Sequence, residues 1–241
     1  LRQAGESLAR LSELQGEVEE GWLSERSTSS KDAAALLCLY HIAHATVRTS
    51  EFLLAGSVEQ DGRHITDFEP ELRRLLVRAE EFASIASAED LRLWTKTSGS
   101  ALFVLRESSI WVQAKGISER IDMLVEELTR AGRPSPLFSL LPSQQEALRS
   151  ALLDPSRVAL ILQMPTSTGK TLLAEFAIAQ TYDAYSTGTR IVYVVPTRAL
   201  ATQVRRTLTE DLGPLGIKVS AAGSAFEEDP YELHLLNEND G

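Results

Sequence analysis

The chain has 241 residues, of which 43% are hydrophobic and 24% charged, a composition typical of a globular protein with one large or two modest domains. Its single cysteine, Cys38, excludes an internal disulfide and favours a reducing, cytoplasmic location. We expect no membrane association, because no apolar run approaches the length of a membrane span. The formal net charge is -10, but residues 133–226 carry 9 Lys and Arg against 6 Asp and Glu, so this segment is mildly basic.

The first 132 residues predict an all-α domain. Apolar residues recur at spacings of three and four along most of this region, which is the pattern of amphipathic helices. The Ser27–Ser30 run predicts an N-terminal cap, and Asp61-Gly62 predicts a turn. Residues 88–112 stay ambiguous because Ser98-Gly99-Ser100 interrupts their apolar positions. The predicted helices cover residues 1–23, 31–55, 69–87 and 118–131, and the nearly all-apolar 31–55 is expected at the centre of a bundle.

The segment Arg133–Pro136 predicts a domain boundary, with a helical accessory domain over 1–132 and a second domain over 133–241. Its two prolines block helix continuation and favour an extended linker. Beyond the linker, helical and apolar extended segments alternate, which favours right-handed crossovers and a parallel α/β sheet. The predicted strands cover residues 157–163, 190–195 and 217–222.

The most informative motif is Met-Pro-Thr-Ser-Thr-Gly-Lys-Thr, which ends at Thr171 between an apolar run and a helical pattern. A strand, a tight loop ending in Gly-Lys-Thr and a helix form the layout of a phosphate-binding P-loop, although Met164 stands where the motif usually has glycine. Backbone N–H groups and the helix N-terminus favour an anion there. Lys170 would reach the β- and γ-phosphates, and the Thr171 hydroxyl would ligate Mg²⁺. The predicted nucleotide-binding residues are Pro165, Thr166, Ser167, Thr168, Gly169, Lys170 and Thr171, the last two also catalytic.

Two alternatives to this prediction stay open: a plain turn with an exposed lysine, and a loop that no longer binds nucleotide. Two further motifs bear on the choice. Leu-Pro-Ser-Gln-Gln-Glu-Ala-Leu precedes the P-loop strand, and Val-Val-Pro-Thr-Arg-Ala-Leu-Ala-Thr-Gln follows at the end of the next predicted strand, ending at Gln203. Together with the P-loop they resemble superfamily 2 DExD/H-box helicases, and most closely the Ski2-like branch, over residues 137–222.

This resemblance implies a RecA-like P-loop NTPase fold, ATP and Mg²⁺ as cofactors, and single- or double-stranded nucleic acid as the partner. It implies an ATP-dependent helicase or translocase, with 3′→5′ movement for the Ski2-like branch. By the same resemblance Gln144 would read adenine, since a carboxamide offers one donor and one acceptor. The adjacent Gln145 leaves the register open, and a polar residue at a helix start is the alternative.

The resemblance also implies that Pro196, Thr197 and Arg198 contact the nucleic-acid backbone. A loop leading into a helix N-terminus can hold a phosphate through N–H groups and a hydroxyl, and such contacts are independent of base sequence. The alternative is a structural turn with a solvated arginine. Arg205 and Arg206 are expected to be solvated helix residues.

The acidic Walker B motif, which would position Mg²⁺ and the attacking water, is not recognisable. Glu227-Glu228-Asp229 follows no apolar strand, and Asn237–Asp240 lacks the leading aspartate. We therefore expect an N-terminal fragment with a truncated first RecA-like domain, whose hydrolysis requires segments outside this chain, including a second RecA-like domain.

Other candidate residues have simpler interpretations. Cys38, His41 and His44 lie three residues apart on a predicted helix, but zinc would need a fourth ligand, so core packing is expected. Trp22, Trp94 and Trp111 are expected as core or interface anchors rather than base-stacking residues. Two other functional classes remain open: a duplex-DNA translocase subunit of a restriction or defence complex, and a non-catalytic interaction module whose helical domain docks a protein such as a nuclease.

Overall fold

The structure, a computed structural model, describes residue 10 and residues 29–150, 152–157, 159–165, 168–185 and 190–221. These form two compact units, one containing Leu1–Arg48 and Glu69–Leu102, the other Thr49–Phe68 and Phe103–Gly241. The predicted helix over 1–23, apart from Arg10, lies outside the described residues, as do Trp22, Thr166, Ser167 and the acidic segments after Phe226. No helix among the described residues is long and apolar enough to cross a membrane.

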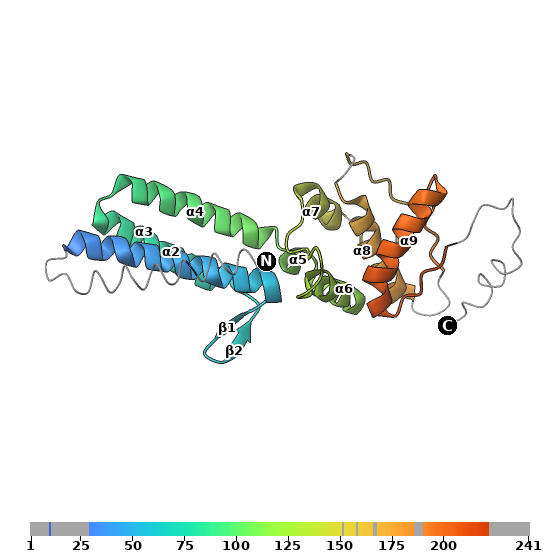
Figure 1. Cartoon of the computed structure of the whole chain (residues 1–241), viewed down its shortest axis with the longest axis horizontal. Helices are drawn as coiled ribbons and strands as arrows, with labels where there is room; N and C mark the ends of the chain where they lie inside the picture. The colour runs from blue at the N-terminus through green and yellow to red at the C-terminus, as the bar shows by residue number, and fades with distance from the viewer. Residues whose placement is uncertain are drawn as a thin grey trace, which may run out of the picture. The chain divides into compact units, whose positions relative to one another are not determined.

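The first unit contains most of α2 (Ser30–Ala55), all of α3 (Glu69–Ala86) and most of α4 (Glu89–Glu107), which run side by side (Figure 1). The structure therefore confirms the predicted helices over 31–55 and 69–87. A reciprocal cap opens α2: the Asp32 N–H donates to Ser29 Oγ at 3.2 Å, and the Ser29 N–H donates to the Asp32 carboxylate at 3.3 Å. Local capping chemistry thus sets the start of α2, as the Ser27–Ser30 run predicted.

The core of this unit contains Cys38, Ile42, Ala79 and Ala83, with two partly buried residues, Phe82 and Leu91, packed against it. One expectation was wrong: α2 is not buried all round, because it exposes a series of large apolar side chains. These are Leu37, Leu39, Tyr40, Val47 and Leu54.

The segment 88–112, ambiguous in sequence, contains one continuous helix, α4, which runs through Ser98-Gly99-Ser100. Gly99 is buried, and a Cβ built on it would lie 3.4 Å from the two terminal methyl groups of Leu76 on α3. The glycine therefore marks a close approach of α3 and α4 and not a helix end.

The second unit includes a hairpin of β1 (Val58–Gln60) and β2 (Arg63–Ile65), paired antiparallel with Val58 opposite Ile65. The turn residues Asp61 and Gly62 have φ values of 51° and 75°, the left-handed conformation that a two-residue hairpin turn requires. The structure thus confirms the predicted Asp61-Gly62 turn (Figure 1).

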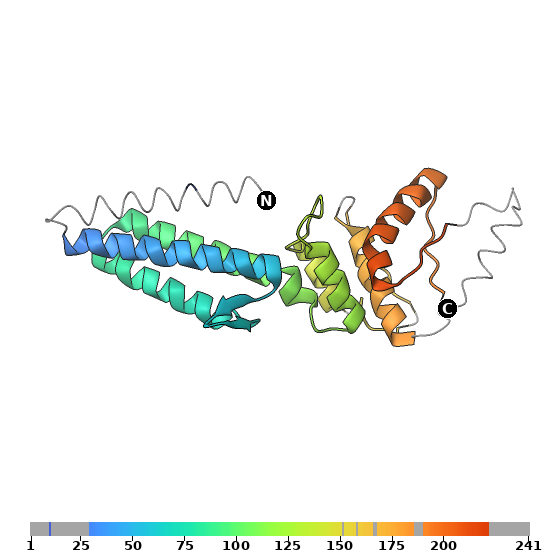
Figure 2. The same cartoon turned by 60° about the horizontal axis from the view of Figure 1, so that its bottom comes forward.

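The larger part of the second unit is helical. It contains α5 (Ile110–Ala114), α6 (Glu119–Thr129), α7 (Pro142–Arg149), α8 (Lys170–Tyr185), α9 (Arg198–Leu212) and the short 3₁₀ helix η1 (Gly213–Leu215). Helices α6, α8 and α9 pack on one another, and α7 packs on α5 and α8 (Figure 2). Buried side chains supply the apolar contacts among these helices, namely Leu124, Leu173, Phe176 and Leu212. The predicted helix over 118–131 is confirmed as α6.

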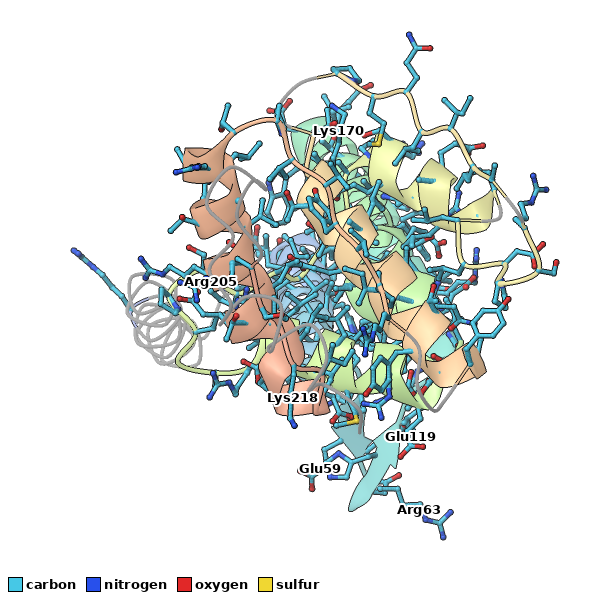
Figure 3. The ribbon with its side chains drawn as sticks, turned by 90° about the vertical axis from the view of Figure 1, so that its right-hand side faces the viewer. Glu59, Arg63, Glu119, Lys170, Arg205 and Lys218 are labelled. Carbon is cyan, nitrogen blue, oxygen red and sulfur yellow. The ribbon has the colours of Figure 1, made fainter. Side chains whose placement is uncertain are left out.

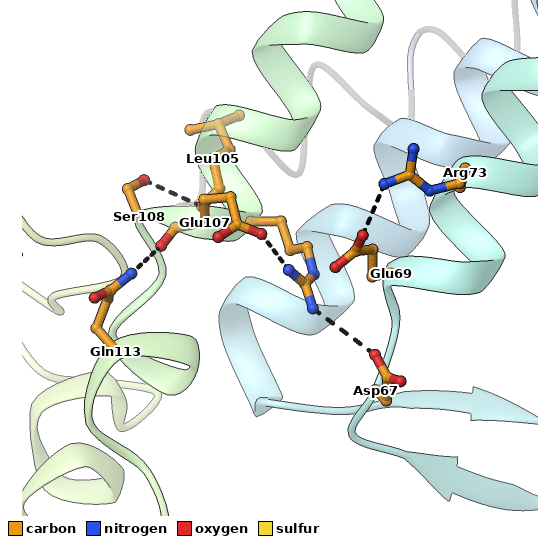
Figure 4. Close-up of polar contacts among 8 residues, drawn as sticks. Asp67, Glu69, Arg73, Leu105, Glu107, Ser108 and Gln113 are labelled. Atoms are coloured by element: carbon orange, nitrogen blue, oxygen red, sulfur yellow. Dashed lines mark hydrogen bonds and ion pairs between the residues drawn. The ribbon is translucent and has the colours of Figure 1, made fainter.

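Polar contacts close the turn between α4 and α5 (Figure 4). Arg106 pairs with Glu107 and lies 3.8 Å from the carboxylate of Asp67. The Gln113 side chain donates to the Glu107 carbonyl at 2.6 Å, and the Ser108 hydroxyl donates to the Leu105 carbonyl at 3.1 Å. These bonds satisfy backbone carbonyls at the C-terminal end of α4.

The predicted linker after Arg133 folds back onto the preceding helices. The Leu137 N–H donates to the Leu128 carbonyl at 2.9 Å, the Ile110 N–H to Phe138 at 3.0 Å, and the Leu140 N–H to Ser108 at 2.7 Å. Residues on both sides of the predicted boundary at 132/133 therefore belong to one compact unit. Proline signals identify the irregular backbone here, but the tertiary hydrogen bonds decide which helices it joins.

The predicted parallel sheet is not formed among the described residues, where the hairpin is the only sheet. The described parts of 157–163, 190–195 and 217–222 lack ladder pairing, so these three strand predictions are corrected. Ile161, Val192 and Val194 are 93%, 81% and 84% exposed. An apolar pattern of this kind is typical of strands that neighbouring strands cover. A ladder depends on such neighbours, and the local sequence does not specify them.

Candidate nucleotide-binding site

The P-loop precedes α8, and Lys170 is the first residue of that helix (Figure 3). The Lys170 ammonium donates to the Pro165 carbonyl at 2.6 Å, and the Thr168 hydroxyl donates to the same carbonyl at 2.8 Å. Gly169 has a φ of +76°, a conformation that glycine adopts without strain. The loop is therefore closed on itself, with its lysine held at the position where α8 begins.

Gln144 lies between the N-terminus of α7 and the P-loop and is only 5% exposed. Its Oε1 accepts from the Leu141 N–H at 2.8 Å, and its Nε2 donates to the Thr168 carbonyl at 3.0 Å. Gln145 instead donates to the Leu140 carbonyl at 2.8 Å. Each end of the Gln144 carboxamide makes one hydrogen bond within the chain, which leaves one N–H and one lone pair for adenine. That role stays a prediction.

Gly169 permits this arrangement, since a Cβ at its position would lie 2.3 Å from Gln144 Nε2. The Gln144 side chain already occupies the position of that Cβ, so a larger residue than glycine would collide with it. The exposed Lys170 ammonium and the N-terminus of α8 both favour an anion next to this loop.

Thr171 is half-buried in the first turn of α8. Among the described residues, no group of three His, Cys, Asp or Glu side chains is placed to hold a metal ion. The Thr171 hydroxyl as a ligand of Mg²⁺ stays a prediction.

The second candidate loop, Pro196-Thr197-Arg198, opens α9. Thr197 is the N-cap, and its hydroxyl accepts from the Leu200 N–H at 3.3 Å. All three residues are exposed, so the start of α9 is accessible to an anion. Contact with nucleic acid stays a prediction.

Two arginines further along α9 were expected to be solvated, and the structure confirms this. Arg205 and Arg206 are exposed, and Arg206 pairs with Glu210 of the same helix at 2.8 Å (Figure 3).

The second unit contains three charged residues that the sequence did not single out, of which two form an ion pair and the third, Glu175, is buried. Glu175 of α8 and Asp211 of α9 are each 2% exposed, and Arg133 pairs with Asp211 at 2.7 Å. Burial, reinforced by the charge of Asp211 and opposed by Arg133, raises the pKa of Glu175 to about 8. The bond to Asp211 raises the pKa of Arg133. The available sequence signal was a glutamate within the apolar pattern of α8.

The residues weighed for zinc lie in the packing of the first unit. Cys38 is fully buried and its Sγ lies 3.2 Å from Thr95 Oγ1; burial raises the pKa of this thiol. The His41 ring stacks on Phe82 with centroids 5.6 Å apart. Burial, and then Arg78, lowers the pKa of His41.

The two described tryptophans differ. Trp111 is 7% exposed and its indole N–H donates to the Leu53 carbonyl at 3.1 Å, which confirms a core anchor. Trp94 is 48% exposed, so it does not lie in the core that the described residues form.

The segment that carries this loop is similar to known proteins. Residues 141–238 match the family model of the DEAD/DEAH box helicases. This match confirms the superfamily 2 resemblance carried by the P-loop and its two flanking motifs. No solved structure matches the chain significantly.

The chain is similar to ATP-dependent DNA helicases named Hel308. It is 36% identical to the protein of Pyrococcus abyssi over 102 residues, which are 42% of this chain and 14% of the relative. It is 37% identical to the protein of Methanocella arvoryzae over 97 residues, 39% of this chain and 12% of the relative. The chain thus spans a small fraction of the length of these relatives.

A third similar protein is the Hachiman protein HamB of Bacillus cereus, 26% identical over 133 residues, which are 55% of this chain and 12% of that protein. An alignment of this length exceeds the stretch from Arg133 to Gly241, so it extends upstream of the predicted domain boundary.

Proposed function

We propose, from the match of residues 141–238 to the family model of the DEAD/DEAH box helicases, that this chain supplies the ATP-binding part of an ATP-dependent nucleic-acid helicase or translocase. The observation that carries the proposal is the P-loop geometry within the matched segment. Lys170 begins α8, and Gly169 holds the left-handed conformation that brings the loop backbone close to it.

In this proposal Lys170 releases the Pro165 carbonyl and moves its ammonium onto the β- and γ-phosphates. The N-terminus of α8 adds N–H groups and the positive end of its dipole. Thr171 ligates Mg²⁺, and bound Mg-ATP supplies the phosphoryl group whose transfer to water drives movement. The acidic and arginine residues that complete hydrolysis come, in this proposal, from segments outside the chain.

The exposed start of α9 is the proposed contact with nucleic acid. Thr197 and Arg198 would hold a backbone phosphate there, independently of base sequence. Binding through such contacts should weaken steeply as salt rises, because counterions are released when phosphates are neutralised.

Lys170→Ala in the complete protein tests this function. We expect the variant to fold normally, to bind ATP at least about tenfold more weakly and to lose nucleic-acid-stimulated hydrolysis. The reason is that it lacks the lysine's positive charge, which would stabilise the negative charge developing on the phosphate. Lys218→Ala is a matched control, since Lys218 is an exposed lysine of the same unit at the opposite end of the view in Figure 3. Wild-type hydrolysis by Lys170→Ala would refute the proposal.

A strand-displacement assay separates the two forms of motor. A helicase releases a labelled strand from a duplex with an overhang, whereas a duplex translocase hydrolyses ATP on the same DNA and releases none. A non-catalytic interaction module would instead retain its biological activity in Lys170→Ala.

A further inference from the structure

Helix α2 exposes an apolar face that points away from the core of the first unit. Cys38 and Ile42 lie on its buried face. Tyr40 and Val47 lie on the opposite face, where they are 47% and 44% exposed. Residues 33–47 include no Lys, Arg, Asp or Glu, so no charged side chain solvates this face. A helix that is apolar all round is normally buried on every side, so the face opposite the core calls for a further partner.

The residues of this exposed face have the spacing of a coiled-coil seam. They recur at alternate steps of three and four residues, which keeps their side chains in one line along the helix. They are Ala33, Leu36, Tyr40, Ala43 and Val47, here called the α2 seam. Each of them is exposed or only partly buried. A seam of this kind is the surface on which a second helix packs its own seam.

The first 22 residues of the same chain carry a matching pattern. Their apolar residues recur at the same alternate steps of three and four, with Gln15 as the single polar member. The apolar members are Leu1, Ala4, Leu8, Leu11, Val18 and Trp22. Arg10 lies outside this pattern, and it is helical and exposed. The segment therefore offers one apolar seam and places Arg10 off it.

The connection to α2 decides the direction in which the two seams can meet. Residues 23–29 separate Trp22 from the first residue of α2, and the reciprocal Ser29–Asp32 cap sets that start. Connections of this length usually join antiparallel helices. Leu8–Trp22 and Ala33–Val47 each cover fourteen steps, about 21 Å of helix, so a segment that turns back after Trp22 matches the α2 seam in length.

Glycines in the segment make its helix dependent on such packing. Gly5, Gly16 and Gly21 each lower helix propensity by about 1 kcal/mol relative to alanine. A single helix of about this length is marginal in water even without glycine. Burial of its apolar seam supplies the stabilisation that the local sequence lacks.

We propose that residues 1–22 form a helix that packs antiparallel on the α2 seam. This inference is independent of the nucleotide loop, and it concerns the open alternative in which the helical region docks another protein. With the α2 seam covered by the chain itself, such a protein has to bind elsewhere. The exposed apolar residues Leu93, Trp94 and Val104 of α4 are then the surface left for it.

Cysteine cross-linking in the complete protein tests the contact. Leu11→Cys is combined in turn with Tyr40→Cys, Ala43→Cys and Val47→Cys, and the disulfide is scored by mass spectrometry after mild oxidation. A disulfide forms only where two Cα atoms come within about 7 Å. Arg10→Cys with the same three partners is the matched control, because Arg10 lies one residue away and off the seam. The single variant Leu11→Cys reports any bond to the native cysteine.

We expect at least one Leu11 pair to form an intramolecular disulfide about fivefold faster or more than the corresponding Arg10 pair, because packing raises the effective concentration of the two thiols. Equal rates for the two sets would overturn the proposal, and so would the absence of any intramolecular bond. Disulfides formed only between chains would assign the α2 seam to a second copy, which also overturns it.

Tryptic cleavage after Arg10 gives a second measurement that needs no new cysteine. Val47→Glu places a charge in the α2 seam and should speed this cleavage about tenfold or more, because proteolysis follows the population of the undocked segment. Val104→Glu is the same change at a valine that is 66% exposed on α4 and should leave the rate unchanged. Thermal unfolding confirms that both variants are folded. Equal rates in the wild type and both folded variants would overturn the proposal, and if Val47→Glu does not fold, the cross-linking pairs decide.

Discussion

Hydrogen bonds to the Pro165 carbonyl define the conformation of the P-loop. It accepts from both Lys170 and Thr168, while the Thr168 carbonyl accepts from Gln144. The Lys170 ammonium and the Thr168 hydroxyl, which would face a phosphate, are therefore already hydrogen-bonded inside the chain. Nucleotide binding exchanges these bonds for bonds to phosphate, so its net free energy depends on how well the loop tolerates that exchange.

Gly169→Ala should disturb this loop selectively. The substituted Cβ would lie 2.3 Å from Gln144 Nε2, and the φ of +76° is strained for alanine. We expect a loss of about 1–3 kcal/mol in stability and a loss of ADP binding. Gly116→Ala is the control, because its φ is also positive, +87°, but no atom lies within 4 Å of the new Cβ. If both variants bind ADP equally well, the Gln144 contact does not shape the loop.

Glu175→Gln should change the pH dependence of stability. The folded pKa of about 8 is above the ordinary value of 4.5, so the folded state binds a proton that the unfolded state has lost between these two pH values. Wild-type stability therefore falls by about 1.4 kcal/mol per pH unit across that window and levels off above it. The glutamine variant should lack this contribution and be the more stable protein at pH 8. Urea unfolding from pH 5 to pH 9 measures both slopes, and parallel slopes would contradict the assignment.

The sequence identified Lys170, Gly169 and Gln144 because their signals are local: a short motif, and a glutamine at a helix start. The structure places all three together. The sequence could not identify the Arg133–Asp211 pair or the burial of Glu175, because both depend on how the helices of this unit pack. Pairing between residues 133 and 211 leaves no trace in local spacing.

At the scale of elements, Gly99 shows why a local break signal failed. A glycine between two serines lowers helix propensity, yet α4 continues because Gly99 faces Leu76 on α3. Gly99→Ala should gain about 1 kcal/mol of helix propensity and meet the Leu76 methyl groups at 3.4 Å, an ordinary contact. We expect a small net stabilisation of about 0.5 kcal/mol, measured by urea unfolding. A loss above about 1 kcal/mol would show that α3 and α4 cannot yield at this contact.

The strand predictions failed because a strand in a sheet needs a partner strand, which the local sequence does not supply. The segments 159–163 and 190–195 have the apolar residues of buried strands, and their backbones lack helix, but they pair with no strand among the described residues. Extended conformation follows from local composition, whereas a ladder requires a second strand in register. Exposed Ile161 and Val192 are the side chains that a neighbouring layer would cover.

At the scale of the molecule, the division into units crosses the predicted boundary at Arg133. Helices α5 and α6 lie outside the helicase-family match, yet they belong to the same compact unit as α8 and α9. The similarity to HamB also extends upstream of Arg133. The prolines mark where the chain becomes irregular, but backbone hydrogen bonds from residues 137–140 to the preceding segment place α5 and α6 in the same compact unit as α8 and α9.

Arg120→Ala tests whether α6 supports this unit. The Arg120 side chain lies 3.3 Å from the Asp183 carboxylate, stacks 4.5 Å from the Tyr182 ring centroid and donates to the Leu215 carbonyl. Because these groups belong to α8 and η1, losing the side chain should cost about 1–3 kcal/mol in unfolding free energy and weaken ADP binding. Arg130→Ala, which removes a pair with Glu127 whose arginine side chain is 64% exposed, should cost less than about 1 kcal/mol. If Arg120→Ala lowers stability without affecting ADP affinity in the folded protein, α6 stabilises the unit but does not hold α8 in its binding position.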